Sequence, residues 1–243
     1  MKKVLKWFAC AALLFVSSGC SSSKVDDAAL DRLEAELKKF SEVESMDYTM
    51  GVDAPDSKVK AEIYGSFIAE TKEISMAVDM EASGQKMEKF MEIYFKDNMM
   101  YVSAMGTQQK QEADMSAFDG IGLDPDTMQF DKKSLKNNLK EATIKDNTIH
   151  MVIKDDVLKE YVKKQGSSLS SMGVDEITEA SIDMECGEDL MNSLTITLTG
   201  TDDGETKTFS VYVKFANVNQ IKEIEYPNGL DDWPLAENSG FLE

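Results

Sequence analysis

The side chains that most often carry catalysis or bind metals are scarce in this chain of 243 residues. It has one histidine, His150, and three cysteines. Catalysis or a zinc site needs several such groups brought together, and the sequence contains no glycine-rich phosphate loop and no His-Glu-x-x-His motif. Two acidic stretches, at 124–126 and 202–205, lack the ligand spacing of an EF-hand calcium loop. We therefore predict no enzyme activity, no catalytic residue, no bound metal and no cofactor, with His150 structural or solvated.

Cys20 is the residue with the clearest chemical expectation. Three lysines near the amino terminus precede an apolar run at residues 7–16, and small residues at 17–19 lead directly to Cys20. The apolar run is shorter than the roughly 20 residues that a membrane-spanning helix needs, and it is typical of a secretory signal. Small residues ending in Gly-Cys resemble the bacterial lipobox, whose cysteine receives diacylglycerol. We predict a lipoprotein signal over 1–19 and a lipidated Cys20 with a polar tether over 20–24; an ordinary cleaved signal is the alternative.

The composition excludes several kinds of partner. Lysine and arginine total 26 against 45 acidic residues, and the formal net charge is −19. Residues 1–19 contain three lysines and no acid, so the remainder carries a net charge of −22. Nucleic-acid binders are basic, and adhesion to anionic membranes through protein charge needs a polybasic patch. We predict no nucleic-acid partner, and attachment to the extracytoplasmic face of the cell membrane through a lipid anchor on Cys20.

Cys186 is expected to be an inert core residue. Cleavage before Cys20 removes Cys10, and acylation occupies Cys20, so Cys186 has no disulfide partner left within the chain. It lies in phase with Ile182 and Met184 in an alternating stretch. A free cysteine in such a position behaves as a small buried hydrophobe.

The apolar pattern predicts one early helix and then a long antiparallel meander. Asp26 and Asp27 supply N-cap chemistry for a helix over 27–40, whose apolar residues form one stripe. After it the pattern changes to alternation, which is typical of half-buried strands. Further helices are predicted from Asp131 and over 155–172. The strands with clear bounds, in a total of about twelve, are 46–52, 59–69, 74–82, 87–95, 107–113, 149–153, 179–186 and 221–226.

Two-residue turns predict which of these residues share a face of the sheet. A turn at 83–84 or 84–85 pairs even residues of one strand with odd residues of the next. Turns at 97–98, 146–147 and 203–204 extend the same argument to three more hairpins, with Ile144 opposite Ile149 and Leu198 opposite Phe209 in the last two. Eight apolar residues on one face follow from the first two turns: Met76, Val78, Met80, Met87, Met91, Ile93, Met100 and Val102.

The whole arrangement resembles the LolA/LolB-like group of bacterial envelope lipoproteins, with a plan similar to the LppX/LprG-like proteins. A lipobox, a first amphipathic helix, a methionine-rich meander, a mid-chain helix and closing strands carry the resemblance. In style, the stretches 84–88, 98–102 and 221–227 are closest to uncharacterised Gram-positive lipoproteins. The resemblance covers about residues 25–228 and implies a single domain there, with 229–243 as a C-terminal tail. It implies an α+β fold, a strongly curved antiparallel sheet of about 11 or 12 strands, forming an incomplete β-barrel with helices on its concave side.

The sixteen methionines suggest a function for the shared apolar face. Methionine is soft and adaptable, and it is used where a surface accepts varied apolar ligands. Copper(I) binding is less favoured, because methionine clusters combined with histidine are absent. We predict that the eight apolar residues named above line a cavity for a lipid or another hydrophobic ligand. The alternative is a non-catalytic structural, interaction or envelope-sensing lipoprotein whose own side chains fill the core.

Overall fold

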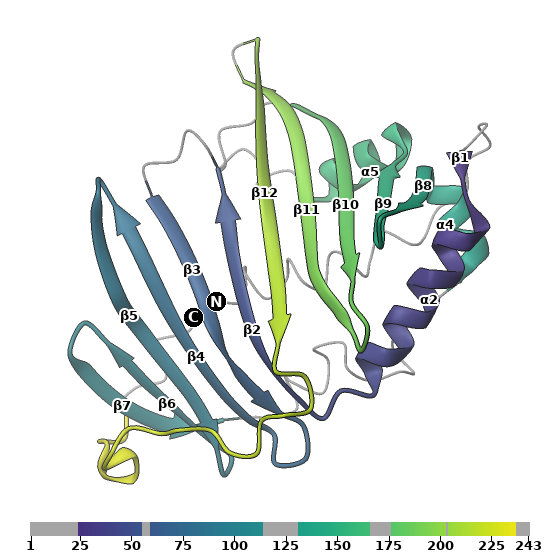
Figure 1. Ribbon diagram of the computed structural model, residues 1–243. Coiled ribbons are helices and arrows are strands. Elements are labelled where there is room, and N and C mark those ends of the chain that lie inside the picture. The colour runs from purple at the N-terminus through teal and green to yellow at the C-terminus, as the bar shows by residue number, and fades with distance from the viewer. Residues whose placement is uncertain (1–23, 55–58, 114–130, 166–175, 203, 237–243) are drawn as a thin grey trace.

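One unclosed sheet of twelve strands dominates the computed structural model, which describes residues 24–54, 59–113, 131–165, 176–202 and 204–236. Within these ranges three α-helices gather beside one part of the sheet (Figure 1). They are α2 (Asp27–Ser41), α4 (Lys132–Asn138) and α5 (Asp155–Gln165). The predicted α+β fold, a curved antiparallel sheet with helices, is confirmed. The predictions for residues 1–19 and Cys20 concern residues outside the described ranges, as do those for the acidic stretch at 124–126 and for residues 166–172 of the predicted helix.

The sheet consists of two meanders that meet side by side. The strands are β1 (Lys24–Val25), β2 (Ser45–Asp53), β3 (Val59–Ile68), β4 (Glu73–Ala82), β5 (Gln85–Lys96), β6 (Met99–Ala104), β7 (Thr107–Glu112), β8 (Leu139–Lys145), β9 (Thr148–Ile153), β10 (Glu176–Cys186), β11 (Met191–Asp202) and β12 (Glu205–Ala216). Their order is β1-β8-β9-β10-β11-β12-β2-β3-β4-β5-β6-β7. All neighbours are antiparallel except β1, which runs parallel to β8. The meanders β8–β12 and β2–β7 therefore join where β12 pairs with β2.

The registers of all four predicted hairpins are confirmed. Ala82 pairs with Gln85 across the turn at 83–84, and Lys96 pairs with Met99 across the turn at 97–98. The pairs that these registers place on the apolar face are Met76 with Ile93, Val78 with Met91, Met80 with Met87, Ile93 with Val102, Ile144 with Ile149, and Leu198 with Phe209. Local turn chemistry thus decided the side of the sheet on which each of these side chains lies.

The helices cover the part of the apolar face formed by β8–β10. Asp26 caps α2, because its side chain accepts a hydrogen bond from the Ala28 amide at 2.9 Å. Ala29 and Leu33 are buried, as the predicted stripe requires, and α2 contacts β8 and β9 while α5 contacts β10. The resulting core contains, among others, Leu30, Leu135, Ala142, Ile149, Met151, Val157, Leu158, Ile182 and Met184.

Strand β5 has two more residues than β4 in one stretch of their pairing. This β-bulge explains why Lys89 stands at a position where the alternating pattern calls for an apolar residue. Val78 pairs with Met91 and Met80 with Met87, so Asp79 faces three residues of β5 in a β-bulge. Lys89 lies in this bulge with a positive φ of 49°. Its backbone amide donates to Asp79 Oδ1 at 2.9 Å, and this bond is the largest cause of the lowered pKa of Asp79. The bulge keeps Met87 and Met91 on one face and removes Lys89 from it.

We expect Asp79→Asn to weaken the domain at neutral pH by about 1 kcal/mol, because a hydrogen bond to a charged acceptor is replaced by a neutral one. The pKa of Asp79 is lowered in the folded chain, so its contribution exists above its unfolded pKa and is lost as pH falls through the folded value. The difference in free energy of unfolding between wild type and variant should therefore shrink below about pH 4. Urea unfolding at several pH values measures it. Glu81→Gln, an exposed change on the same strand, should show no such convergence; a pH-independent gap for Asp79→Asn would contradict this account.

The predicted strand at 221–226 is wrong, and a short strand at the amino terminus was missed. Residues 221–226 form no strand in the described chain, although Ile224 is buried. The preceding strand β12 already has β11 and β2 as neighbours, so the chain beyond it finds no free edge and crosses the strand ends (Figure 1). Alternation marks a half-buried extended chain but does not say whether a partner strand is available. The missed strand β1 pairs with β8 and is the twelfth strand of the sheet.

The C-terminal segment packs on the sheet face opposite the helices. The Trp233 ring lies edge-on against Tyr94 and Tyr101, with centroid distances of 6.5 and 6.2 Å. The Tyr101 hydroxyl donates to Asp231 Oδ1 at 3.1 Å. Residues 229–236 belong to the predicted C-terminal tail over 229–243. They form a small apolar cluster with β5 and β6.

The same segment covers part of the edge strand β7. The Lys110 amide donates to the Pro234 carbonyl at 2.8 Å, and the Ala236 amide donates to the Lys110 carbonyl at 2.9 Å. An edge strand otherwise presents unpaired backbone groups that can pair with another chain. The C-terminal segment and the charge of Lys110 both blunt this edge.

Candidate ligand-binding face

The apolar face of the sheet is built from rows of residues that cross many strands in register. One row runs from Met151 through Ile182 and Ile196 to Val211 and Val52. On the next strands a row runs from Ala61 through Met80 to Met87, and Val52 and Ala61 lie directly beyond the last pair of β2 and β3, Gly51 with Glu62. Because side chains at paired positions point to the same side, the face is one continuous apolar surface from β9 to β5.

The eight predicted residues share this face but differ in how deeply they lie. Ile93 is 1% exposed, and Val78, Met100 and Val102 are also buried. Met76, Met80 and Met91 are half-buried, and Met87 is 37% exposed. Their shared face is confirmed by the registers, whereas their role as a cavity lining stays a prediction.

The face carries two separate packed clusters. One is the large core under α2 and α5, which reaches across β8–β12. The other is smaller and contains Ile74, Ile93, Phe95, Met100 and Val102, with Met76 and Met91 packed against it. Between them, on β2 and β3, Met50 and Ile63 are half-buried. Half-buried apolar side chains in the middle of such a face leave surface that a ligand can cover.

Tyr48 introduces a polar group into the middle of this face. It pairs with Gly65, which in turn pairs with Met76. Its hydroxyl donates to the Ser75 carbonyl at 3.1 Å, and burial raises the pKa of Tyr48 above its ordinary value. The hydroxyl is thus satisfied within the protein, and the ring presents an apolar surface.

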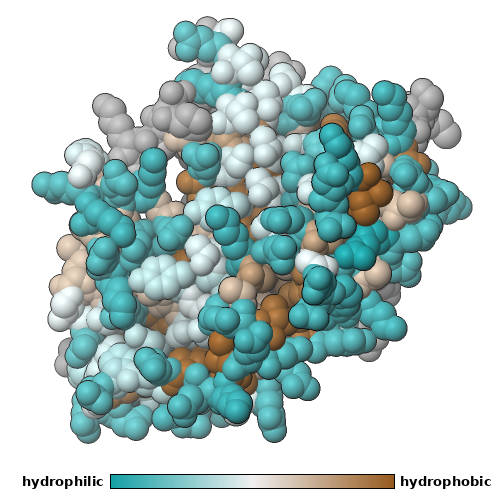
Figure 2. Space-filling view, viewed as in Figure 1, coloured by the Kyte–Doolittle hydropathy of each residue, from teal (hydrophilic) through white to brown (hydrophobic). Residues whose placement is uncertain are grey.

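The opposite face of the sheet is polar. Figure 2 shows this face, with a pale band of weakly polar residues over β11 and β12 among charged ones. The hydroxyls of Thr197 and Ser210 lie 2.9 Å apart, and Tyr212 donates to Glu62 Oε2 at 2.9 Å. His150 lies on this face, half-exposed, with Nδ1 2.7 Å from Asp183 Oδ1. This contact joins the neighbouring strands β9 and β10 on the polar face.

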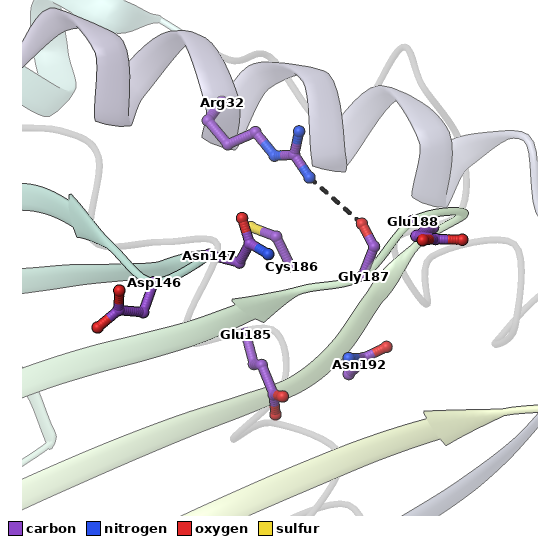
Figure 3. A pocket seen from close by; sticks show the side chains of 8 residues that line it. All are labelled: Arg32, Asp146, Asn147, Glu185, Cys186, Gly187, Glu188 and Asn192. Atoms are coloured by element: carbon purple, nitrogen blue, oxygen red, sulfur yellow. Dashed lines mark hydrogen bonds between the residues drawn. The ribbon is translucent and has the colours of Figure 1, made fainter.

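A polar hollow of about 730 Å³ lies between α2 and the ends of the neighbouring strands (Figure 3). Arg32 points across it and donates to the Gly187 carbonyl at 3.3 Å. Cys186 lies beneath and is buried, which confirms its predicted position. The remaining lining residues are Asp146, Asn147, Glu185, Glu188 and Asn192. Polar and charged groups dominate this lining, so it does not suit an apolar ligand.

The buried Glu36 pairs with the two cations of α2 that bond to the turn beside this hollow. Its Oε1 lies 2.9 Å from Arg32 Nη2 and 3.2 Å from Lys39 Nζ, and its side chain is completely buried. Lys39 also donates to the Glu188 carbonyl at 3.0 Å. A buried carboxylate is tolerated only when it is paired, which accounts for the two cations one helical turn away on either side. The described residues contain no group of three or more His, Cys, Asp or Glu side chains that could hold a metal ion.

Sequence reasoning missed the part of the face contributed by β2 and β3. Val52, Met50 and Ile63 belong to the same rows as the predicted residues. Their alternation was visible, but their neighbours on β12 come from the far end of the chain. No two-residue turn links β12 to β2, so parity could not connect the two meanders.

Across the described part of the chain, none of the helices combines the length and the apolar character needed to cross a membrane.

Comparisons with known proteins give similar folds without similar sequences. No protein-family model and no curated protein sequence matches the chain. Among solved structures, it is similar to the lipoprotein LppX of Mycobacterium tuberculosis, with 10% identity over 82% of this chain and 100% of that one, and a TM-score of 0.46. LprF from Mycobacterium bovis shows 12% identity over 85% and 99% of the two chains, with a TM-score of 0.42. LppX and LprF are thus two lipoproteins to which this chain is similar over most of its length.

Proposed function

We propose that this protein is a membrane-anchored extracytoplasmic lipoprotein that binds or carries a lipid or another hydrophobic ligand on its apolar face. The supporting observation is that this face remains half-exposed beyond the part that the helices cover. Met76, Met80 and Met91 point to the inner face yet are not fully buried. A face closed by its own side chains would bury them as completely as it buries Ile93.

The anchor is the second part of the proposal. The described chain begins with β1 at an edge of the sheet, only four residues after Cys20. A diacylglycerol group there would hold the domain at the membrane, because two acyl chains bind stably where one binds marginally. Acylation of Cys20 concerns residues outside the described chain and stays a prediction.

The alternative is a structural or sensing lipoprotein with a self-filled core. The cluster around Ile93 favours it locally, because Ile93, Val102 and Met100 are packed tightly together. The two hypotheses predict different responses to a buried charge. A carboxylate placed in a closed core costs several kcal/mol and unfolds a marginally stable domain, whereas one placed in a ligand site can be hydrated when the ligand leaves.

We expect Met91→Glu to fold and to lose binding of a fluorescent fatty acid, and Ile93→Glu to unfold. The two residues are neighbours on one strand and one face, and they differ in burial. Circular dichroism measures folding, and a titration with the probe measures binding. Met105→Glu, on a side chain that is 81% exposed, is the control and should change neither.

Wild-type protein that binds no apolar probe, together with natively purified protein whose organic extract contains no lipid, would overturn the ligand-binding proposal. In that case Met91→Glu should unfold as Ile93→Glu does, and the self-filled core would be the better description.

A further inference from the structure

Exposure along one apolar row of the sheet rises from the helix-covered strands to β2. At the helix-covered end of the row, Met151 is 4% exposed and Ile182 is 8% exposed. Val211 is half-buried, and Val52, its partner on β2, is 44% exposed. On β3–β5 follow Ala61 and Met80, which are half-buried, and then Met87, which is 37% exposed. Val52 and Met87 are thus apolar side chains of the inner face that reach solvent.

Each of the next two rows inward contains a buried side chain. Beside Val52 and Met80 lies the row of Met50 and Val78, in which Val78 is 8% exposed. Beyond it lies the row that contains Ile93, 1% exposed. The apolar face therefore opens at one end only of β2–β5, at the side of the turn at 83–84, and closes toward the other end.

We propose that the row Val52, Ala61, Met80 and Met87 is the entrance through which the acyl chain of an amphiphile reaches the apolar face. This inference rests on the proposed function and adds to it the route and the class of ligand. Two apolar side chains of the inner face reach solvent at the same strand ends, although exposing apolar side chains costs about 25 cal/mol per Å². An acyl chain that passes over them would cover that surface.

The charges at the same end suit a polar head group that stays outside. Lys60 pairs with Glu81, and Glu81 pairs with Lys86, on the outer side of the same strand ends. All three side chains are exposed. A head group left at the entrance therefore meets cationic and anionic groups in water, while the chain lies against apolar ones. This arrangement selects a molecule with one apolar and one polar part.

A flat protein partner fits the geometry less well. A partner would cover Val52 and Met87 from outside, but the apolar surface continues inward along β4, past Met80 and Met76. Interfaces between proteins end in a polar rim, whereas an acyl chain needs a continuous apolar path.

The test narrows the entrance with larger side chains and measures the association and dissociation rates of a fatty acid. In the full chain carrying Cys20→Ser, Val52→Trp and Met87→Trp place large rings on side chains that are already exposed, so folding should be unchanged by circular dichroism. A dansyl-labelled fatty acid is mixed with each variant in a stopped-flow instrument. We expect association and dissociation to slow together by about tenfold while Kd stays the same, because the barrier rises and the end states do not change. Met105→Trp is the matched control on an exposed methionine outside this row.

The outcomes separate the entrance from the function. If the wild type binds the probe and both tryptophan variants bind it at the wild-type rate, the entrance is wrong and the ligand-binding face stands. A weaker Kd with an unchanged association rate would also overturn the entrance, because it would place Val52 and Met87 inside the binding site. If the wild type binds no probe, both proposals fail. Wild-type protein that is a dimer in sedimentation, and becomes monomeric in the two variants, would show that a second copy covers this row.

Discussion

Gly65→Ala is expected to destabilise the domain by about 3 kcal/mol or more, because no space exists for the added methyl group. A Cβ atom at Gly65 would lie 1.9 Å from the Ser75 carbonyl oxygen, 2.8 Å from its carbon and 3.0 Å from Met76 Cα. All three atoms belong to the backbone of β4, so the strands would have to separate. The same Ser75 carbonyl accepts the Tyr48 hydroxyl, and that hydrogen bond would be lost in addition. Urea unfolding followed by circular dichroism measures the effect.

Gly51→Ala is the control for this prediction. Its Cβ would also meet atoms within 3 Å, but they belong to the ring of Tyr212, which can rotate away. The cost should then be about 1 kcal/mol, roughly the loss of the hydrogen bond from Tyr212 to Glu62. Equal losses in the two variants would contradict the argument that the close approach of two backbones at Gly65 is decisive.

Trp233→Ala should release the C-terminal segment and uncover the edge of β7. Trp233 is buried against Tyr94 and Tyr101, and truncation of a buried aromatic residue costs about 3–5 kcal/mol. Because the segment is terminal, it can detach without unfolding the sheet, so the loss should appear mainly as local opening. Hydrogen exchange of the Lys110 amide, which donates to the Pro234 carbonyl, should accelerate by about a hundredfold or more.

The exposed Leu235 offers a control within the same segment. It is 65% exposed, so Leu235→Ala should leave the exchange of the Lys110 amide unchanged. We further expect Trp233→Ala to self-associate at high concentration, because an uncovered edge strand pairs with another chain. Slow exchange at Lys110 in Trp233→Ala would mean that backbone pairing alone holds the segment.

Short-range signals carried most of what could be predicted about the fold. The helix over 27–40 followed from Asp26 and its apolar stripe, and the structure begins and ends it within one residue of that range. Each hairpin register followed from a two-residue turn, which is a local device. The bulge at Lys89 could not be predicted, because an alternating pattern with one lysine is equally compatible with a regular strand that exposes it.

Features that depend on contacts between remote parts of the chain could not be predicted from the sequence. The pairing of β12 with β2 and the docking of Trp233 on β5 and β6 both join residues from remote parts of the chain. The predicted strand at 221–226 failed for the same reason, since alternation says nothing about a vacant edge. For the candidate site, parity placed eight residues on one face, whereas the gradient of exposure that ends at Val52 depends on where the helices lie.

The junction of the two meanders has a consequence for the order in which the molecule folds. The hairpins of β2–β7, and those of β8–β9 and β10–β12, close over short loops, which is fast. The β12–β2 pairs, such as Val213 with Met50, close a loop that spans most of the domain. Forming them should be the slowest step, because loop-closure entropy is lost before the contacts form. A newly synthesised chain would then exist for a time as two partly folded sheets, with β2 and β12 as exposed, apolar edges.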